Sequence, residues 1–223
     1  MTFPLYSKIN SIKKRHQDGP LKGQFLDEWA VPEFEYLADN QWIWREKIDG
    51  RNTRIHVKML GDGADKAVCV DFGGRTNKAE MPKPLLECLQ ELFHPPALDH
   101  YQSAFDEECL RDGITLFGEG YGAGIQSGGA YGPVDFILFD VLIGTSWMTE
   151  ESTTDIAYKL GLRRVPLVAT GTLHDAIDAV KHGYLASDWD GVEPEGLVCV
   201  PAVPLFDRRG HRILTKVKGK DFK

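Results

Sequence analysis

The hydrophobic residues of this chain gather in short runs that are rich in β-branched and aromatic side chains, most of them bounded by Gly, Asp or Pro. Runs of this kind are typical of β-strands. The pattern predicts strands over residues 42–48, 53–60, 67–72, 114–119, 134–143, 196–200 and 212–217. The core of the protein is therefore expected to be built from sheet.

Two other segments have the spacing of an amphipathic helix. The first follows Pro82 and Pro84, and its apolar face is formed by Leu85, Leu89, Leu92 and Phe93. The second begins at Thr172 and ends before Gly183, and its apolar face is formed by Leu173, Ile177 and Val180. Because strands and helices do not alternate regularly, we expect an α+β fold with mainly antiparallel sheets flanked by helices, rather than a doubly wound parallel sheet.

Length and composition narrow the class of protein. A chain of 223 residues can form one well-buried domain or two small lobes, and we expect a single functional domain over residues 1–223 without a separate C-terminal domain. No stretch approaches the roughly 18 apolar residues that span a bilayer, and the N-terminus lacks the apolar core of a signal peptide. We therefore expect a monomer without membrane association, located in the cytoplasm or, for a viral protein, in the host cytoplasm.

The spacing of cysteines and histidines and the net charge argue against several further classes of protein. The 4 cysteines form no CxxC pair, and the 7 histidines have no HExxH spacing, so no zinc ribbon, disulfide framework or histidine metal site is indicated. The formal net charge of −7 argues against a protein that coats nucleic acid through its overall electrostatic field. Any contact with phosphate groups must be local.

The first candidate for chemistry is EKIDGRN, residues 46–52, where a predicted strand ends in a lysine and a glycine turn leads into the next strand. Lys47 is therefore expected at a strand end that faces a cleft. Only the neutral amine of a lysine is a nucleophile, so a reactive lysine needs surroundings that favour the loss of its proton. Lys216 and Lys218 are two positions apart on a predicted strand, so their side chains point to the same face. Nearby positive charge favours the loss of a proton from a lysine, and these two lysines could supply that charge and also stabilise a phosphate. Lysines also protect ordinary edge strands, which is the alternative interpretation.

Carboxylates and aromatic rings supply the other candidates. Glu119 in LFGEGYG and Glu195 in EPEGLVCVP stand beside glycines, where a carboxylate can accept a ribose hydroxyl or hold magnesium. Phe136 and Phe139 lie in VDFILFDVLI, and either ring could stack on a purine or pack in the core. The glycine-rich residues 118–132 resemble a dinucleotide-binding loop, but their spacing differs from GxGxxG and no helix is predicted to follow.

Taken in order, these motifs resemble those of the covalent nucleotidyltransferase superfamily of ATP-dependent ligases and mRNA capping enzymes. KIDG resembles the nucleophile motif, and LFGEGYG, VDFILFDVLI, EGLVCVP and LTKVKGK resemble the motifs that follow it, over residues 46–218. Asn52 stands where DNA ligases carry an arginine, and this residue, together with Tyr131-Gly132 and the opening PLYSKINSI, makes the chain most similar to the RNA ligase 2 family. The resemblance implies a nucleotidyltransferase (ATP-grasp-like) fold around an ATP cleft.

The resemblance also implies roles on the nucleotide. Lys47 would attack the α-phosphorus of ATP, and Glu46, immediately before it, would belong to the nucleotide site. Glu119 would bind the ribose, and Phe139 would stack on adenine.

Further roles concern the phosphates and the metal. Glu195 would orient the lysine and engage a metal ion through water, and Lys216 and Lys218 would contact the α-phosphate. Asn52 would help to organise catalytic Mg²⁺ or Mn²⁺, and Arg75 would act on the AMP phosphate and the polynucleotide end.

The implied reaction has three steps: adenylylation of Lys47 by ATP, transfer of AMP to a 5′-phosphate, and attack by a 3′-hydroxyl that releases AMP. The expected partners are RNA ends, with nicked duplex or DNA as further substrates, and a protein partner could assist end recognition. The alternatives are a DNA ligase or GTP-dependent capping-type enzyme, which share the lysine chemistry, and a non-catalytic nucleic-acid-binding module.

Overall fold

The chain forms two units, which are each described separately below. The computed structural model describes residues 4–93, 98–126 and 128–222. One unit, here called the Asn52 unit, comprises residues 49–165 and the N-terminal segment up to Tyr6, and the other, the Lys47 unit, comprises residues 7–48 and the chain from Pro166 onward. Each unit is therefore assembled from segments that are distant in the sequence.

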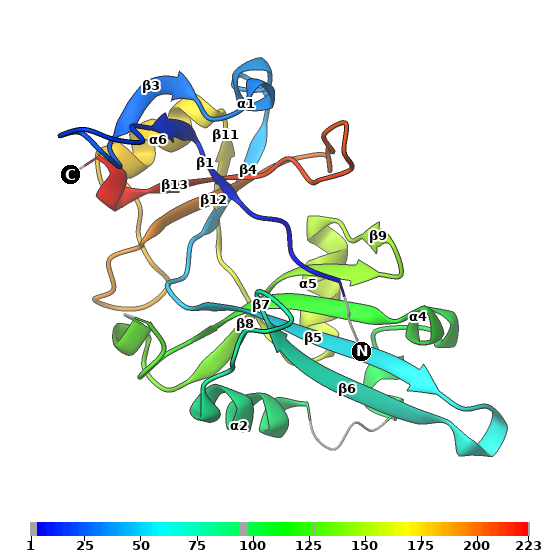
Figure 1. Cartoon of the computed structure of the whole chain (residues 1–223). Helices are drawn as coiled ribbons and strands as arrows, with labels where there is room; N and C mark the ends of the chain where they lie inside the picture. The colour runs from blue at the N-terminus through cyan, green and yellow to red at the C-terminus, as the bar shows by residue number, and fades with distance from the viewer. Residues whose placement is uncertain (1–3, 94–97, 127, 223) are drawn as a thin grey trace. The chain divides into compact units, whose positions relative to one another are not determined.

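The Asn52 unit is built on a six-stranded sheet (Figure 1), in the order β10-β8-β7-β5-β6 with β9 paired to β8. Its strands are β5 (Arg51–Leu60), β6 (Ala67–Gly74), β7 (Ile114–Tyr121), β8 (Asp135–Ile143), β9 (Ser146–Trp147) and β10 (Arg163–Arg164). All pairs are antiparallel except β8 with β10. A short 3-10 helix, η1 (Gly63–Asp65), closes the β5–β6 hairpin.

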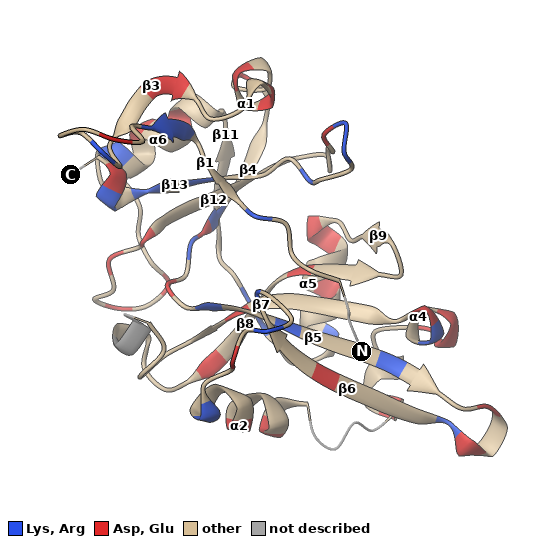
Figure 2. Ribbon diagram, viewed as in Figure 1, with Lys and Arg blue, Asp and Glu red and all other residues tan. Residues whose placement is uncertain are grey.

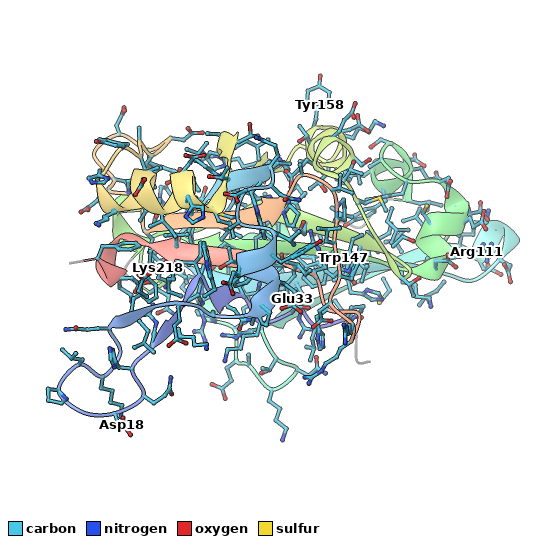
Figure 3. All side chains as sticks on the ribbon, turned by 90° about the horizontal axis from the view of Figure 1, so that it is seen from above. Asp18, Glu33, Arg111, Trp147, Tyr158 and Lys218 are labelled. Carbon is cyan, nitrogen blue, oxygen red and sulfur yellow. The ribbon has the colours of Figure 1, made fainter. Side chains whose placement is uncertain are left out.

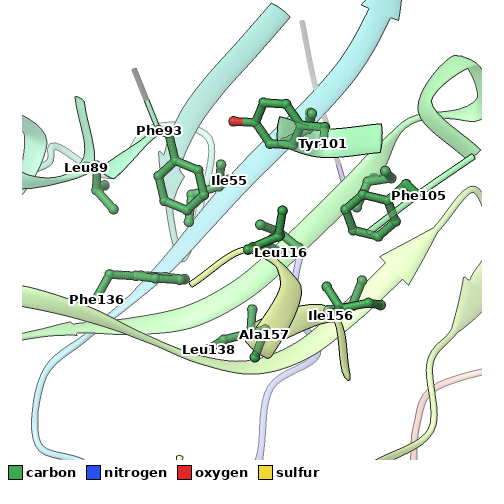
Figure 4. Packing of buried hydrophobic residues seen from close by; sticks show 14 of the residues in the cluster. Ile55, Leu89, Phe93, Tyr101, Phe105, Leu116, Phe136, Leu138, Ile156 and Ala157 are labelled. Atoms are coloured by element: carbon green, nitrogen blue, oxygen red, sulfur yellow. The ribbon is translucent and has the colours of Figure 1, made fainter. Parts of the chain in front are cut away.

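Helices α2 to α5 contribute to one hydrophobic cluster with this sheet (Figure 4). They are α2 (Lys83–Leu92), α3 (Leu98–Gln102), α4 (Glu107–Asp112) and α5 (Glu150–Lys159). Asp106 and Thr149 cap α4 and α5 by accepting hydrogen bonds from backbone N–H groups. Ile55, Leu116 and Leu138 project into the cluster from three neighbouring strands, so one face of the sheet is covered.

The Lys47 unit has a five-stranded sheet in the order β1-β13-β12-β4-β11. Its strands are β1 (Asn10–Ser11), β4 (Trp42–Glu46), β11 (Leu167–Gly171), β12 (Gly196–Pro201) and β13 (Thr215–Lys218), and η3 (Gly219–Asp221) follows the last of them. The hairpin of β2 (Lys13–Arg15) and β3 (Phe25–Trp29), helix α1 (Pro32–Tyr36) and helix α6 (Leu173–Lys181) complete the unit. Residues of these elements pack with Trp42, Leu197 and Val217 of the sheet in a second hydrophobic cluster.

The α+β class with mainly antiparallel sheets is confirmed. Every predicted strand forms, although β4 ends at Glu46, before Lys47 and Ile48, and β13 begins only at Thr215, because Arg212 pairs instead with Phe206 in an isolated bridge. Both predicted helices form as well, and α6 begins at Leu173 because Thr172 and Asp175 form a reciprocal capping box. The glycine-rich segment after β7 leads into a 3-10 helix, η2 (Gly128–Tyr131), and not into the long helix of a dinucleotide-binding fold.

One prediction about packing was wrong. Leu85, Leu89 and Phe93 are buried, whereas Leu92 is 40% exposed and does not belong to the buried face of α2. Leu92 and Phe93 are adjacent, and adjacent helical residues point about 100° apart, so one narrow face cannot bury both of them. In the described part of the chain, every helix is too short or too polar to cross a bilayer.

We predict that Leu89→Ala lowers the free energy of unfolding by about 2–5 kcal/mol, because it leaves a cavity where the side chain is fully buried. Leu92→Ala removes the same atoms from an exposed position on the same helix and should cost less than about 1 kcal/mol. Urea unfolding followed by fluorescence measures both values. Equal losses for the two variants would contradict the assigned face of α2.

Candidate nucleotidyl-transfer site

Lys47 lies directly after β4 and contacts a carboxylate that is 148 positions away in the sequence. Its Nζ donates a hydrogen bond to Glu195 Oε2 at 2.6 Å. The backbone places both residues, because Lys47 N donates to Gly196 O at 2.9 Å where the ends of β4 and β12 are adjacent. The lysine is thus at a strand end, as the sequence predicts.

Glu195 also accepts a hydrogen bond from Lys218, on its other oxygen, Oε1. One carboxylate therefore lies between two ammonium groups, and all three side chains are less than 20% exposed. Burial by itself would raise the pKa of Glu195, but the charge of Lys47 and the hydrogen bonds from both lysines outweigh it and hold the pKa below its usual range. Glu195 is a carboxylate at neutral pH, and it fixes the position of Lys47.

Lys216 lies on the same face of β13 as Lys218, as predicted from their spacing (Figure 3 labels Lys218). It pairs across the sheet with Val198, which in turn pairs with Arg45 of β4. Residues directly opposite one another in a sheet share a face, so Arg45, only 3% exposed, adds a third cation to this face. Since β13 lies between β12 and β1, it is not the edge strand of the alternative interpretation.

Glu46 is separated from this group although it precedes Lys47. It pairs with Leu197 on the hydrophobic face of the sheet and is only 2% exposed. Its Oε1 accepts a hydrogen bond from Ser187 at 2.6 Å. Burial raises the pKa of Glu46, and the hydrogen bonds from Ser187 and the backbone of Asp188 oppose that rise. The arrangement anchors the chain before β12 to β4, which supports Lys47 from the opposite face.

In the Asn52 unit, the register brings three of the other predicted residues to one face of the sheet. Asn52 pairs with Glu119, and Glu119 pairs with Ile137. The register of β8 against β7 shifts at Phe139, and Tyr6 packs on both Phe139 and Phe117, which is two positions before Glu119 on β7. This face is opposite the one that bears Leu116 and Leu138 in the hydrophobic cluster. Asn52, Glu119 and Phe139 therefore share the face of the sheet that the helices leave uncovered.

The two candidate phenylalanines have different environments. Phe136 is 1% exposed and packs in the hydrophobic cluster, so it belongs to the core. Phe139 is half-buried beside Tyr6, with ring centroids 5.0 Å apart in an edge arrangement. Tyr6 also packs on Phe117 and Trp147 (labelled in Figure 3) and donates a hydrogen bond to Asp140, next to Phe139. The N-terminal segment thus holds one side of Phe139.

A cavity of about 310 Å³ in the Asn52 unit is lined by Asn52, Glu119 and Arg75, among other residues. Arg75 is exposed and directly follows β6. The Oδ1 atom of Asn52 is buried and has no hydrogen-bond partner among the residues that the structure describes. A buried amide oxygen without a donor is a suitable ligand for a hard cation or its water.

The glycine of KIDG is required by close packing. A Cβ atom at Gly50 would lie 2.4 Å from Gly120 O and 2.8 Å from Glu119 Cγ. Gly118 is equally constrained, because a Cβ atom there would lie 2.2 Å from the ring of Phe136. Gly50 lets the chain before β5 lie close to β7 beside Glu119, and Gly118 leaves room on β7 for Phe136 of β8.

Metal binding was predicted for Asn52 and Glu195. Asn52 fits that role through its unpaired oxygen. Both oxygens of Glu195 accept hydrogen bonds from lysines, so Glu195 is suited to contact a metal ion through a water molecule. Among the described residues, no group of three or more His, Cys, Asp or Glu side chains is arranged to hold a metal ion.

Sequence reasoning gave no role to four residues of these surroundings: Tyr6, Arg45, Arg54 and Tyr131. Tyr131 and the opening that contains Tyr6 entered it only as part of the family resemblance. Tyr131 accepts a hydrogen bond from the backbone N–H of Asp49, inside KIDG, at 3.3 Å. Arg45 lies on β4, two positions before Lys47, and this spacing was a local signal for it. The contacts of the others join distant segments, so they have no local pattern.

Solved structures of an RNA ligase from Naegleria gruberi have the same fold. A variant without ligand matches 99% of this chain with a TM-score of 0.60 and 14% identity, and a variant with AMP and manganese matches 99% with a TM-score of 0.61 and 14% identity. A third, with ATP and manganese, matches 100% with a TM-score of 0.61 and 15% identity. This chain covers 58% of the length of each.

These matches show that the chain has the nucleotidyltransferase fold of RNA ligases, as the resemblance implied. The family model for RNA ligases matches residues 40–218, which include Lys47, Glu195 and Lys218. The chain belongs to the RNA ligase family.

The ion pairs of Glu195 predict a pH-dependent stability. Glu195→Gln should lower the free energy of unfolding by about 1–3 kcal/mol at pH 7, because two partly buried ammonium groups lose their counter-charge. Since the native pKa is depressed, this contribution is present above the unfolded value of about 4.3 and is lost as the pH falls through the native pKa. Urea unfolding at a series of pH values measures it.

The matched control is Glu35→Gln, which alters an exposed carboxylate on α1. It should leave the stability difference from the unaltered protein close to zero at every pH. A loss for Glu195→Gln that persists unchanged at pH values well below the native pKa would contradict the ion-pair account.

Proposed function

We propose that this protein is an ATP-dependent RNA ligase that forms a covalent lysyl-AMP intermediate on Lys47 and joins a 5′-phosphate end to a 3′-hydroxyl. The observation that carries the proposal is the contact of Lys47 with Glu195, which also binds Lys218. A lysine at a strand end, oriented by a carboxylate and flanked by a second ammonium group, is suited to attack a phosphate. The family and the presence of ATP, AMP and manganese in solved relatives support the same chemistry.

In the first step Lys47 Nζ attacks the α-phosphorus of ATP. The ammonium group of Lys47 first gives a proton to solvent and leaves Glu195. A P–N bond then forms, the bond between the α- and β-phosphates breaks, and pyrophosphate leaves. Lys218, released from Glu195 or shared with it, and Lys216 on the same face of β13 stabilise the negative charge on the phosphates.

Residues of the Asn52 unit act on the nucleotide and the metal ion in the same reaction. We assign the ribose to Glu119 and the adenine to Phe139, which share one face of the sheet. Asn52 offers its unpaired oxygen to Mg²⁺ or Mn²⁺, directly or through water. The cation, when bound, would neutralise phosphate charge during the displacement.

The later steps use the RNA ends. The 5′-phosphate of RNA attacks the lysyl-AMP, the P–N bond breaks and Lys47 leaves, and a 3′-hydroxyl then attacks the activated 5′-phosphate and releases AMP. We assign contact with the AMP phosphate and the polynucleotide end to Arg75, whose exposed side chain lines the cavity beside Asn52 and Glu119. Asn52 in place of an arginine favours the RNA ligase 2 type within the family.

The exact nucleic-acid substrate, the oligomeric state and the location in the cell remain predictions. Nicked duplex, DNA ends and a protein partner for end recognition are each separable by sealing assays with matched substrates. The predictions of a monomer in the cytoplasm await sedimentation and localisation measurements. Basic residues lie on β13 and β5 (Figure 2), and contacts of basic residues with phosphate groups weaken as the salt concentration rises, so substrate binding should weaken with salt.

We predict that incubation with Mg²⁺ and ATP adds the mass of a single AMP to the protein, and that Lys47→Ala abolishes the adduct because the nucleophile is gone. Intact-protein mass spectrometry measures it, with GTP and NAD run in parallel. Lys22→Ala, which alters an exposed lysine of the same unit, is the control and should retain the adduct.

Three other outcomes would contradict the proposal. An adduct with GTP but not ATP would indicate capping-type chemistry. Sealing of DNA ends but not RNA ends by the adenylylated protein would indicate a DNA ligase. The absence of any adduct, with RNA binding intact, would indicate a non-catalytic binding module.

Asn52 provides a separate prediction about the metal ion. Asn52→Ala should raise the Mg²⁺ concentration needed for half-maximal adenylylation by about 10-fold or more, because a ligand oxygen is lost. Asn52→Asp keeps an oxygen in the same place and should shift the requirement much less. A Mg²⁺ titration of the initial rate measures both, and equal shifts would contradict the assignment.

A further inference from the structure

Arg54 on β5 is fully buried inside the Asn52 unit. It stands seven positions after Lys47, outside the motifs that carry the chemistry, and pairs with Phe117 of β7. It therefore lies on the same face of the sheet as Asn52, two positions before it. A charged group is expensive to bury unless its N–H donors are satisfied, so its acceptors indicate what it stabilises.

The acceptors of Arg54 lie on both sides of Arg75. Nε donates a hydrogen bond to Gly74 O at 2.6 Å, and Nη2 donates to Asn77 Oδ1 at 3.0 Å. Nη1 donates to Pro4 O at 2.9 Å, in the N-terminal segment that contains Tyr6. One guanidinium thus joins three segments and holds the loop at residues 74–79 just before and just after Arg75.

We propose that Arg54 is a positioning residue that holds the loop of residues 74–79 on the sheet and thereby sets the place of Arg75 for AMP transfer to the RNA end. The inference rests on the proposed function, because it requires that Arg75 acts in that step. Arg54 is fully buried, and two of the three acceptors named above belong to this loop, so we place its effect on the reaction in the loop.

The geometry of the guanidinium explains why an arginine is required here. Its planar fork donates to two acceptors at fixed angles, whereas a lysine is a point charge on a flexible stem. Arg75, Thr76 and Asn77 are exposed, so little else packs against this part of the loop. A displacement of about 1 Å in a group that acts on a reacting phosphate costs about 100-fold in rate.

The experiment measures single-turnover transfer of AMP from the adenylylated protein to a 5′-phosphorylated RNA oligonucleotide. Arg54→Lys should slow the transfer by about 10-fold or more, because one of the loop contacts is lost. Adenylylation of Lys47 by ATP should stay close to that of the unaltered protein. The same variant on an Arg75→Ala background should cause no further loss, since a residue that acts only through Arg75 has nothing left to position.

A second pair of variants avoids the buried position in case Arg54→Lys fails to fold. Asn77 is exposed, so Asn77→Ala removes one acceptor without disturbing the core and should slow the transfer in the same direction. Asn77→Asp keeps the acceptor oxygen and should restore transfer. This rescue separates positioning from a general loss of stability.

Each outcome bears on the inference. Independent, multiplicative losses in the double variant, unchanged transfer in Asn77→Ala, or no effect of Arg75→Ala would overturn the positioning role while leaving the proposed function in place. The absence of an AMP adduct on the unaltered protein would overturn the proposed function and this inference together.

Discussion

The contact that organises the reactive lysine is the carboxylate of Glu195 between the ammonium groups of Lys47 and Lys218. Two like charges at this spacing repel one another, and one shared anion makes their proximity stable. The depressed pKa of Glu195 keeps that anion ionised under all but acidic conditions. The rest of the Lys47 unit supports this contact, because pairing of β4, β12 and β13 brings the three residues together across the sheet.

In the Asn52 unit, the register of the strands places the candidate residues on one face of the sheet. The pairing of β5, β7 and β8 aligns Asn52, Glu119 and Ile137, and Phe139, where the register shifts, packs with Phe117 against Tyr6 on the same face. The helices bury the other face with Ile55, Leu116 and their neighbours. A shift of one residue in either ladder would turn the polar side chains of Asn52 or Glu119 towards the hydrophobic cluster. Close packing at Gly50 and Gly118 opposes such a shift.

In each of the two units, buried polar residues hold segments next to the candidate reactive groups. Glu46 is held by Ser187 on the hydrophobic face of its sheet, Tyr131 binds the backbone at Asp49, and Arg54 binds both sides of Arg75. Each of these groups is hydrogen-bonded and restrains a residue next to it in sequence or space. Positions close to a reacting phosphate need such restraint, because rate is sensitive to small displacements.

The linear order of residues was sufficient to indicate the strands, the fold class and the reactive motifs, because alternation, glycine turns and lysine spacing are local properties. Local pattern also placed Lys216 and Lys218 on one face. Pairing between distant segments decided three features that the sequence did not show. These are the partners of Glu195, the separation of Glu46 from Lys47, and the different environments of Phe136 and Phe139. The contacts of Tyr6 and Arg54 were missed for the same reason, since a hydrogen bond between residues far apart in the chain leaves no periodic signal in either segment.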